Sequence, residues 1–315
     1  MNEDTLNAER QASALLITRD ALLEIWHGRA AALDPMDALL VATVIQANVD
    51  PATSSLDDQV EHSAMERPPP DEVRRPVSIS RLADSMDLRF ETVRRRVNRL
   101  KDMGVFVTEP TGILVPESYF MTPANAAIVL AIDDLAERTY WRLVNLHYFN
   151  STPLPRPAHK PEQHPYRAVA RLFMNYALRM GGEMRAIGGD YINLLLVMQL
   201  NQMNTVNLGD VRKWEPDDDL PTIADPRRLP VTIAALSRES GVPFETTRRR
   251  LADLAERGVC RLVDGGYIVP ADNIQALGLV ISPINRMNLT RLYRNCALVG
   301  AIDSWEARME VRTAS

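Results

Sequence analysis

Two runs of three arginines are the residues of this chain best suited to a chemical task. Residues 90–96 read Phe-Glu-Thr-Val-Arg-Arg-Arg, and residues 244–250 read Phe-Glu-Thr-Thr-Arg-Arg-Arg. A guanidinium group is always charged, and its N–H donors form a fork that matches phosphate oxygens or the acceptors of a guanine. A single such run is usually a solvated helix face. Its recurrence in the same surroundings indicates that a polyanion is bound.

The similarity between the two regions extends well beyond the arginines. Between residues 77–105 and 231–259, 12 of 29 aligned positions are identical without a gap. Further along, Gly112, Val115 and Pro116 are matched by the same residue types 154 positions later. A repeat of this length indicates a duplicated structural unit.

Each copy predicts the same order of elements. A short extended stretch, a short helix, a tight turn at Asp87 or Gly241 and a longer helix are followed by two short extended runs. The longer helices are expected at 90–103 and 244–257, where Val93, Val97 and Leu100 form the buried stripe of the first copy. The extended runs are expected at 105–108, 113–116, 259–263 and 267–270. This order is that of a winged helix–turn–helix.

The pattern Leu-Ala, turn, Glu-Thr-Val-Arg-Arg, Leu, Gly-Val resembles the reading heads of bacterial GntR-type, IclR-type and Crp-type regulators. The resemblance covers residues 77–117 and 231–271, and it departs from the pattern where Arg89 and Pro243 replace the usual serine before the second helix. It implies that the second helix of each unit enters the major groove of DNA. The DNA-binding residues expected from their positions are Arg89, Thr92, Arg94, Arg95, Arg96, Arg99, Thr246, Arg248, Arg249 and Arg250.

These residues are expected to have different roles. Arg95 and Arg96, with Arg249 and Arg250, are expected to be exposed and to contact bases or phosphates. Arg94 and Arg248 lie closer to the buried stripe, where a phosphate or an ion pair with Glu91 or Glu245 would hold them. Thr92 and Thr246 suit phosphate or base contact near the helix start.

Charge makes the two copies unequal. The chain as a whole carries −5, and charged residues make up 24% of it, as in an ordinary soluble protein. The window 89–101 has six basic residues and one acidic residue, a net of +5, whereas 243–255 has three and two, a net of +1. The basic charge is thus concentrated on one helix rather than spread over the chain.

The rest of the chain is mostly helical in pattern. Helices are expected at 14–31, 34–48, 122–148, 190–204 and 282–305, the last opened by Ser282-Pro283. Val44 to Asn48 are aligned with Val197 to Asn201. Three stretches are interpreted as exposed or disordered linkers: 51–76 and 215–230, which contain prolines and acidic residues, and 151–165, which contains five prolines. The fold expected is mainly α with short β-hairpin wings: two tandem winged helix–turn–helix units embedded in helical segments.

The domain organisation follows from the repeat. Residues 1–150 form a first half with the winged unit 77–117. Residues 151–165 link it to a second half, 166–315, with the winged unit 231–271. The long helices 122–148 and 282–305 are the expected surfaces for packing the halves together or for a homodimer.

The sequence offers little support for a catalytic, phosphate-binding or metal site. No nucleophile–base pair, phosphate-cradling loop or metal-ligand cluster stands out, so neither an enzyme nor a cofactor or metal is expected. His147, His159 and His164 have no cysteine near them. The most apolar runs are too short for a bilayer, and two cysteines cannot form a disulfide framework. A cytoplasmic, nucleoid-associated location is therefore expected.

The preferred interpretation is sequence-specific binding of double-stranded DNA by a bacterial transcriptional regulator with two reading heads in one chain. Two alternatives remain open. One is a replication initiator of the plasmid type, which also carries paired winged helices. The other is a winged-helix scaffold that binds proteins.

Overall fold

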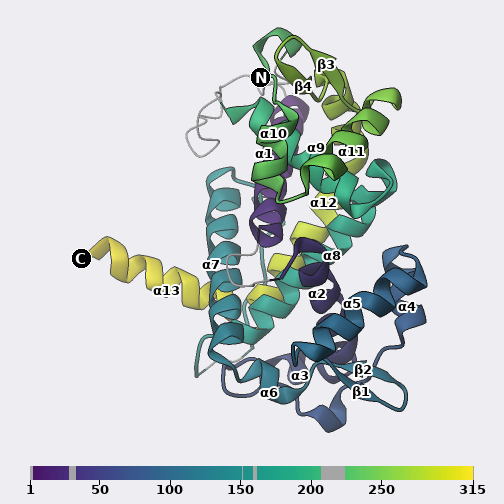
Figure 1. Ribbon diagram of the computed structural model, residues 1–315. Coiled ribbons are helices and arrows are strands. Elements are labelled where there is room, and N and C mark those ends of the chain that lie inside the picture. The colour runs from purple at the N-terminus through teal and green to yellow at the C-terminus, as the bar shows by residue number, and fades with distance from the viewer. Residues whose placement is uncertain (1–2, 28–32, 151, 159–161, 207–223, 315) are drawn as a thin grey trace. The chain divides into compact units, whose positions relative to one another are not determined.

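The computed structural model describes residues 3–27, 33–150, 152–158, 162–206 and 224–314. It is mainly helical, with 70% helix and two small antiparallel hairpins (Figure 1). The expected class, mainly α with short β-hairpins, is confirmed at this level.

Each repeated region forms two helices followed by a hairpin. The first comprises α4 (Ile79–Met86), α5 (Phe90–Asp102), β1 (Val107–Glu109) and β2 (Gly112–Leu114). The second comprises α10 (Ile233–Ser240), α11 (Phe244–Glu256), β3 (Arg261–Val263) and β4 (Gly266–Ile268). In Figure 1 the two sets have the same order of elements. We call them the first and second repeated units.

The turn between the two helices forms as the sequence predicts. The Ser78 and Thr232 side chains cap α4 and α10, each accepting a hydrogen bond from the backbone three residues on. Asp87 (φ 52°) and Gly241 (φ 69°) then end these helices in the left-handed conformation. Asp and Gly are both residues that tolerate this region, so the two copies make one turn with different residues.

A close approach of the backbone explains one glycine that both copies retain. The extended residue before α4, Val77, pairs with Ile113 in the hairpin, and Val231 pairs with Tyr267. A Cβ atom on Gly112 would lie 2.4 Å from the Val77 carbonyl oxygen, and one on Gly266 would lie 2.4 Å from that of Val231. Only glycine allows the third extended segment to join each hairpin.

A buried asparagine that recurs in both copies joins each repeated unit to the helix before it. Asn48 lies at the end of α2 (Pro35–Val49), where its side-chain amide donates to the carbonyls of Arg75 (2.8 Å) and Ile113 (3.2 Å). Its side-chain oxygen accepts from the N–H of Val115 at 3.0 Å. The Asn48 side chain thus binds three backbone groups of the extended segments, two of them in buried hydrogen bonds.

Asn204, at the end of α9 (Tyr191–Asn204), makes the same three contacts in the second unit. Its amide donates to Leu229 and Tyr267, and its oxygen accepts from Val269. Asn48 therefore corresponds to Asn204, not to Asn201. The expected alignment of these helices was wrong by three residues, because it followed a local sequence similarity rather than the residue that meets the hairpin.

The stretch expected as a linker at 51–76 is ordered, which corrects that prediction. It contains the 3-10 helices η1 (Asp50–Thr53) and η2 (Asp71–Val73) and the short helix α3 (Leu56–Glu61). Arg74 is buried there and donates to the carbonyls of Pro69 and Val115. Burial lowers the pKa of Arg74, while the carboxylate of Asp71 beside it acts in the opposite direction. Backbone carbonyls thus hold a segment that composition alone indicated to be loose.

The same contacts recur 154 residues later, in the third of the predicted linkers. Asp225 pairs with Arg228 and accepts from the N–H of Ala271, as Asp71 pairs with Arg74 and accepts from that of Glu117. This part carries the 3-10 helix η5 (Asp225–Arg227). Residues 215–223 of that predicted linker, and residues 151 and 159–161 of the second, lie outside the described residues.

The chain forms two compact units that each draw on both sides of the 151–165 segment. Unit 1 contains 1–27, 141–151 and 179–289, and unit 2 contains 28–140, 152–178 and 290–315. The first repeated unit belongs to unit 2 and the second to unit 1. Three long helices contribute a part to each unit: α7 (Pro123–Asn145), α8 (Tyr166–Gly188) and α12 (Ala271–Leu298). The N-terminal helix α1 (Glu3–Trp26) is in unit 1.

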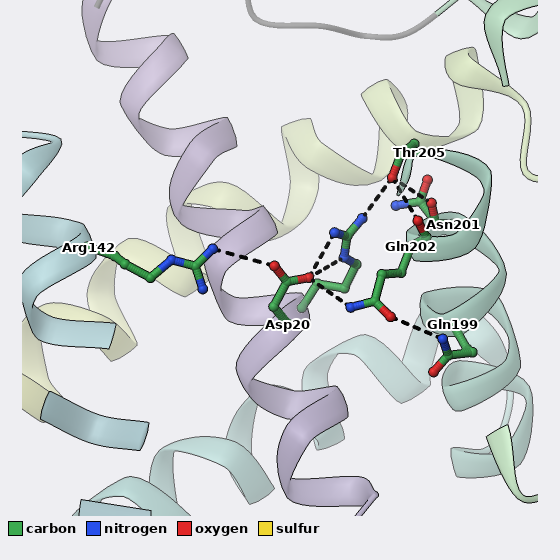
Figure 2. Close-up of polar contacts among 7 residues, drawn as sticks. Asp20, Arg142, Gln199, Asn201, Gln202 and Thr205 are labelled. Carbon is green, nitrogen blue, oxygen red and sulfur yellow. Dashed lines mark hydrogen bonds and ion pairs between the residues drawn. The ribbon is translucent and has the colours of Figure 1, made fainter. Parts of the chain in front are cut away.

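A polar network joins α1 to α9 within unit 1 (Figure 2). The Asp20 carboxylate accepts from Arg19 and Gln202, and it pairs with Arg142 of α7. Arg19 also donates to Thr205. Because charged groups need partners when they leave water, this network fixes which face of α1 packs on α9.

A second polar cluster joins α7 to the C-terminal helix α13 (Ala301–Ala314) within unit 2. The buried His164 ring lies 2.6 Å from the Asp133 carboxylate and 2.9 Å from the Ser304 hydroxyl. Arg308 of α13 pairs with Asp133 as well. Trp305, which is fully buried, packs beside Tyr140. The segment before α8 is therefore anchored by its histidine.

The prediction of a helix at 282–305 was wrong at both ends. Pro283 lies inside α12, which begins at Ala271 and ends at Leu298, and α13 follows from Ala301. Gly300, at φ 81°, separates these two helices. Proline removes one backbone hydrogen bond from a helix, a loss that a long, packed helix tolerates.

We expect Asn48→Ala to lower the free energy of unfolding by about 2–4 kcal/mol, because it removes three hydrogen bonds to the backbone, including the one that the buried N–H of Val115 donates. Asn204→Ala should act in the same way on unit 1. The matched control is Asn98→Ala on the exposed face of α5, which should change stability by less than about 0.5 kcal/mol. Urea unfolding measures all three variants. Equal stabilities for Asn48→Ala and Asn98→Ala would contradict this role.

Candidate nucleic-acid interface

The second helix of each repeated unit buries one stripe and exposes the opposite face. Val93, Val97 and Leu100 of α5 are all at most 1% exposed, and α11 buries Thr247, Leu251 and Leu254 in the same way. Arg95 and Arg249 lie opposite these stripes on the helical period, and both are exposed. Among the described residues neither has an ion-pair or hydrogen-bond partner, so their guanidinium groups are available to an external anion.

Arg96 and Arg250 are held differently, and this corrects the expectation that they are exposed. The Arg96 guanidinium donates to Asp34 at 2.9 Å and to Asp37 at 2.5 Å, and the Asp37 side chain is fully buried. Arg250 pairs with Asp190 and lies 3.5 Å from the Asn193 amide oxygen. Both arginines are half-buried.

The reason lies in the helix packed against the second helix of each repeated unit. Asp34 is the N-cap of α2 and Asp190 is the N-cap of α9, so each carboxylate already points at a helix start. These two aspartates are 156 residues apart, as are Asn48 and Asn204. Arg96 and Arg250 therefore join the repeated units to the preceding helices. The signal in the sequence was Asp-x-x-Asp at 34–37 and Asp-x-x-Asn at 190–193.

Arg99 and the first arginine of each triplet also have carboxylate partners. Arg99 pairs with Asp34 at 2.7 Å and contacts Asp37. Arg94 pairs with Glu91 at 2.7 Å, and Arg248 pairs with Glu245 at 2.9 Å, which confirms the expected ion pairs. The last two pairs are exposed, so they contribute little to stability and leave both arginines within reach of a competing anion.

The start of α5 carries the remaining predicted residues. Arg89 is its N-cap residue and is exposed, with no side-chain hydrogen bond to the helix. Thr92 and its counterpart Thr246 are half-buried. Two further exposed cations of this unit, Arg81 on α4 and Lys101 in the last turn of α5, were not among the predicted site residues. Neither has a partner among the described side chains.

The two faces are therefore unequal in available charge. The first unit exposes four cationic side chains without described carboxylate partners, Arg81, Arg89, Arg95 and Lys101. At the matching positions the second unit has Ala235, Pro243, Arg249 and Ala255. The difference predicted from the sequence persists, although Arg96 and Arg99 no longer contribute to it.

Other kinds of site are not evident in the described part of the chain. No group of three or more His, Cys, Asp or Glu side chains there is placed to hold a metal ion. None of the helices built from those residues is long and apolar enough to cross a membrane. His159 lies outside the described residues, and His164 is engaged with Asp133.

No protein family model, curated protein or solved structure matches this chain. What the two faces can bind therefore follows from their own residues and geometry.

We expect neighbouring arginines to differ in their effect on stability. Arg96→Ala should lower the free energy of unfolding by about 2–4 kcal/mol, because it leaves the buried Asp37 carboxylate under-compensated. Arg95→Ala should change it by less than about 0.5 kcal/mol, because the side chain is exposed and without a described partner. Thermal or urea unfolding of the two variants decides. The ion-pair role of Arg96 is refuted by variants of equal stability.

Proposed function

We propose that the chain binds double-stranded DNA in a sequence-specific manner, as a transcriptional regulator with two winged helices in one polypeptide. The observation that carries this proposal is the pair Arg95 and Arg249. Each is an exposed arginine with no partner among the described residues, opposite the buried stripe of the second helix in a helix–turn–helix followed by a hairpin. That is the position from which a recognition helix meets base edges.

The first repeated unit is proposed as the main reading head. With α5 in the major groove, Arg95 is the residue placed to form a bidentate pair with guanine. Arg89 lies at the helix start, where backbone N–H groups and the helix dipole also favour a phosphate. Arg81 and Lys101 are proposed to contact phosphates, which position the head without reading sequence.

The second repeated unit is proposed as a weaker head that tethering makes useful. Arg249 is its counterpart of Arg95, but uncharged residues replace the other three cations of the first unit. Two heads on one chain raise each other's effective concentration, so a weak second contact adds to the first. A replication initiator with paired winged helices would use the same faces.

A second candidate function applies to the second unit alone. Leu262 on β3 is 64% exposed, where the first unit has Thr108. Asp253 and Glu256 on α11 are exposed as well, and they weaken its attraction for DNA. An exposed apolar hairpin beside mixed charge favours a protein partner, which is the role expected of a winged-helix scaffold.

We expect Arg95→Ala to reduce specific binding by about 1–3 kcal/mol, because it removes one bidentate base contact. The site would be selected from a random duplex pool, and affinity would then be measured by fluorescence anisotropy. Arg138→Ala, an exposed arginine on α7, is the control and should bind as the wild type does. Absence of any duplex binding at low salt by the wild-type chain would refute the proposed function.

The inequality of the heads gives a separate prediction on salt dependence. Each phosphate contact contributes about 0.9 to the slope of log affinity against log salt concentration. Replacing Arg89 and Lys101 by alanine should lower the slope by up to about 1.8, corresponding to two contacts. Grafting these cations onto the second unit, as Pro243→Arg with Ala255→Lys, should raise it. A slope unchanged by both double variants would show that these positions do not meet phosphates.

A further inference from the structure

One face of α12 is apolar and exposed along its length in unit 1. Ala276, Leu279, Val280, Pro283 and Met287 repeat at intervals of three and four residues, so they form one stripe. Leu279 is 77% exposed, Val280 58% and Met287 64%, and Ala276 and Pro283 are exposed too. The stripe is separate from the residues proposed to meet DNA. Isolated exposed apolar residues are common, but a continuous helical stripe marks an interaction surface.

The repeat within the chain supplies an internal comparison. At the register of 154 residues, Leu279, Pro283 and Met287 correspond to Asn125, Val129 and Asp133 of α7, which are all buried. Residues of unit 2 contact that face of α7: Arg167 lies 3.4 Å from Asn125, and His164 and Arg308 bind Asp133.

Solvation alone would favour apolar residues on a covered helix face and polar residues on an exposed one, and these two helices show the opposite. Where α7 is covered, two of the three residues are polar; where α12 is open to solvent, all three are apolar. This reversal indicates that the α12 face is covered in the functional state.

The charges at the ends of the stripe indicate what covers it. Asp272, Leu279 and Arg286 are spaced by seven residues, so they lie on one row along α12. Asp272 and Arg286 are exposed, and neither makes an ion pair or a hydrogen bond with another side chain that the structure describes. An acid and a base placed symmetrically about a central leucine form a self-complementary pattern. A second copy of the same helix, packed antiparallel across a two-fold axis at Leu279, brings each Asp272 opposite the other copy's Arg286.

We propose that the stripe on α12 is a self-association surface, through which two copies of the chain pair antiparallel about Leu279. The apolar side chains supply the buried area, and the two reciprocal ion pairs set the antiparallel orientation. This assigns a specific helix face and register to the homodimer expected from the long helices. It does not depend on DNA binding, because the surface is defined without any of the DNA-facing residues.

The first test measures the oligomeric state of the full chain without DNA. Sedimentation equilibrium should show a dimer at tens of micromolar, and Leu279→Glu or Met287→Glu should raise the dissociation constant about tenfold or more, because the two-fold axis places each changed residue in the interface twice. Leu130→Glu, at an exposed leucine of α7, is the matched control and should leave it unchanged. Because Leu279 and Met287 are exposed, both variants should fold, and circular dichroism checks this.

The second test addresses orientation. Asp272→Arg and Arg286→Asp should each weaken the dimer about threefold or more, because each places like charges opposite each other twice. The double variant should restore wild-type association. Leu279→Cys should form a disulfide-linked dimer under mild oxidation. The two native cysteines are buried, and burial raises the pKa of Cys260 to about 11 and raises that of Cys296, so neither should compete.

The outcomes separate the possible occupants of the stripe. A wild-type chain that stays monomeric at these concentrations overturns the proposal and leaves the face to another protein or to a further segment of this chain. A dimer that is insensitive to Leu279→Glu and Met287→Glu also overturns it, because association then uses another surface. A dimer weakened by these changes but not restored by the charge exchange refutes the antiparallel register. None of these results bears on whether the reading heads bind DNA.

Discussion

A buried asparagine at the end of one helix is the contact on which each repeated unit depends. The extended segments of a two-stranded hairpin have few partners for their backbone groups, and a buried group without a partner is costly. Asn48 and Asn204 each supply one acceptor and two donor contacts at the point where the hairpin, the preceding segment and the helix meet. The hairpin is therefore part of a packed unit with α2 or α9 rather than an isolated two-stranded ribbon, which would be marginally stable.

The same preceding helix also decides which arginines are available to a ligand. Its N-cap carboxylate, Asp34 or Asp190, faces the third arginine of the triplet and neutralises it. The first arginine is held by a glutamate one helical turn earlier. Only the middle arginine is left without a described partner in both copies. A run that looks like three equivalent charges therefore has three roles, because successive residues on a helix point about 100° apart.

Duplication has produced two copies that keep one framework and differ on their surfaces. The asparagine, the glycine in the hairpin and the ion pair Asp34–Arg96 or Asp190–Arg250 are the same in both, since each is fixed by a contact within its own unit. The exposed positions have diverged: the first copy retains its cations, and the second has exchanged most of them for uncharged residues. The long helices after the hairpins diverge as well, with polar residues buried on α7 and apolar residues exposed on α12. Such differences allow one fold to serve several contacts in one chain.

The sequence alone determined the mainly helical class, the two repeated units, their turns and the buried stripes of α5 and α11. These follow from local patterns, because helical periodicity and turn residues act over a few positions. Only the tertiary structure decided the rest. Asp34 and Arg96 are 62 residues apart, so nothing local indicates that they meet. Arg74 is buried in a segment whose composition resembles a linker, and Pro283 lies within a helix it was expected to begin. That Asn48 corresponds to Asn204 in the repeat could likewise be established only by seeing which side chain reaches the hairpin. Asn48, Arg74 and Asp34 each meet a partner from a distant part of the chain, which local sequence patterns do not indicate.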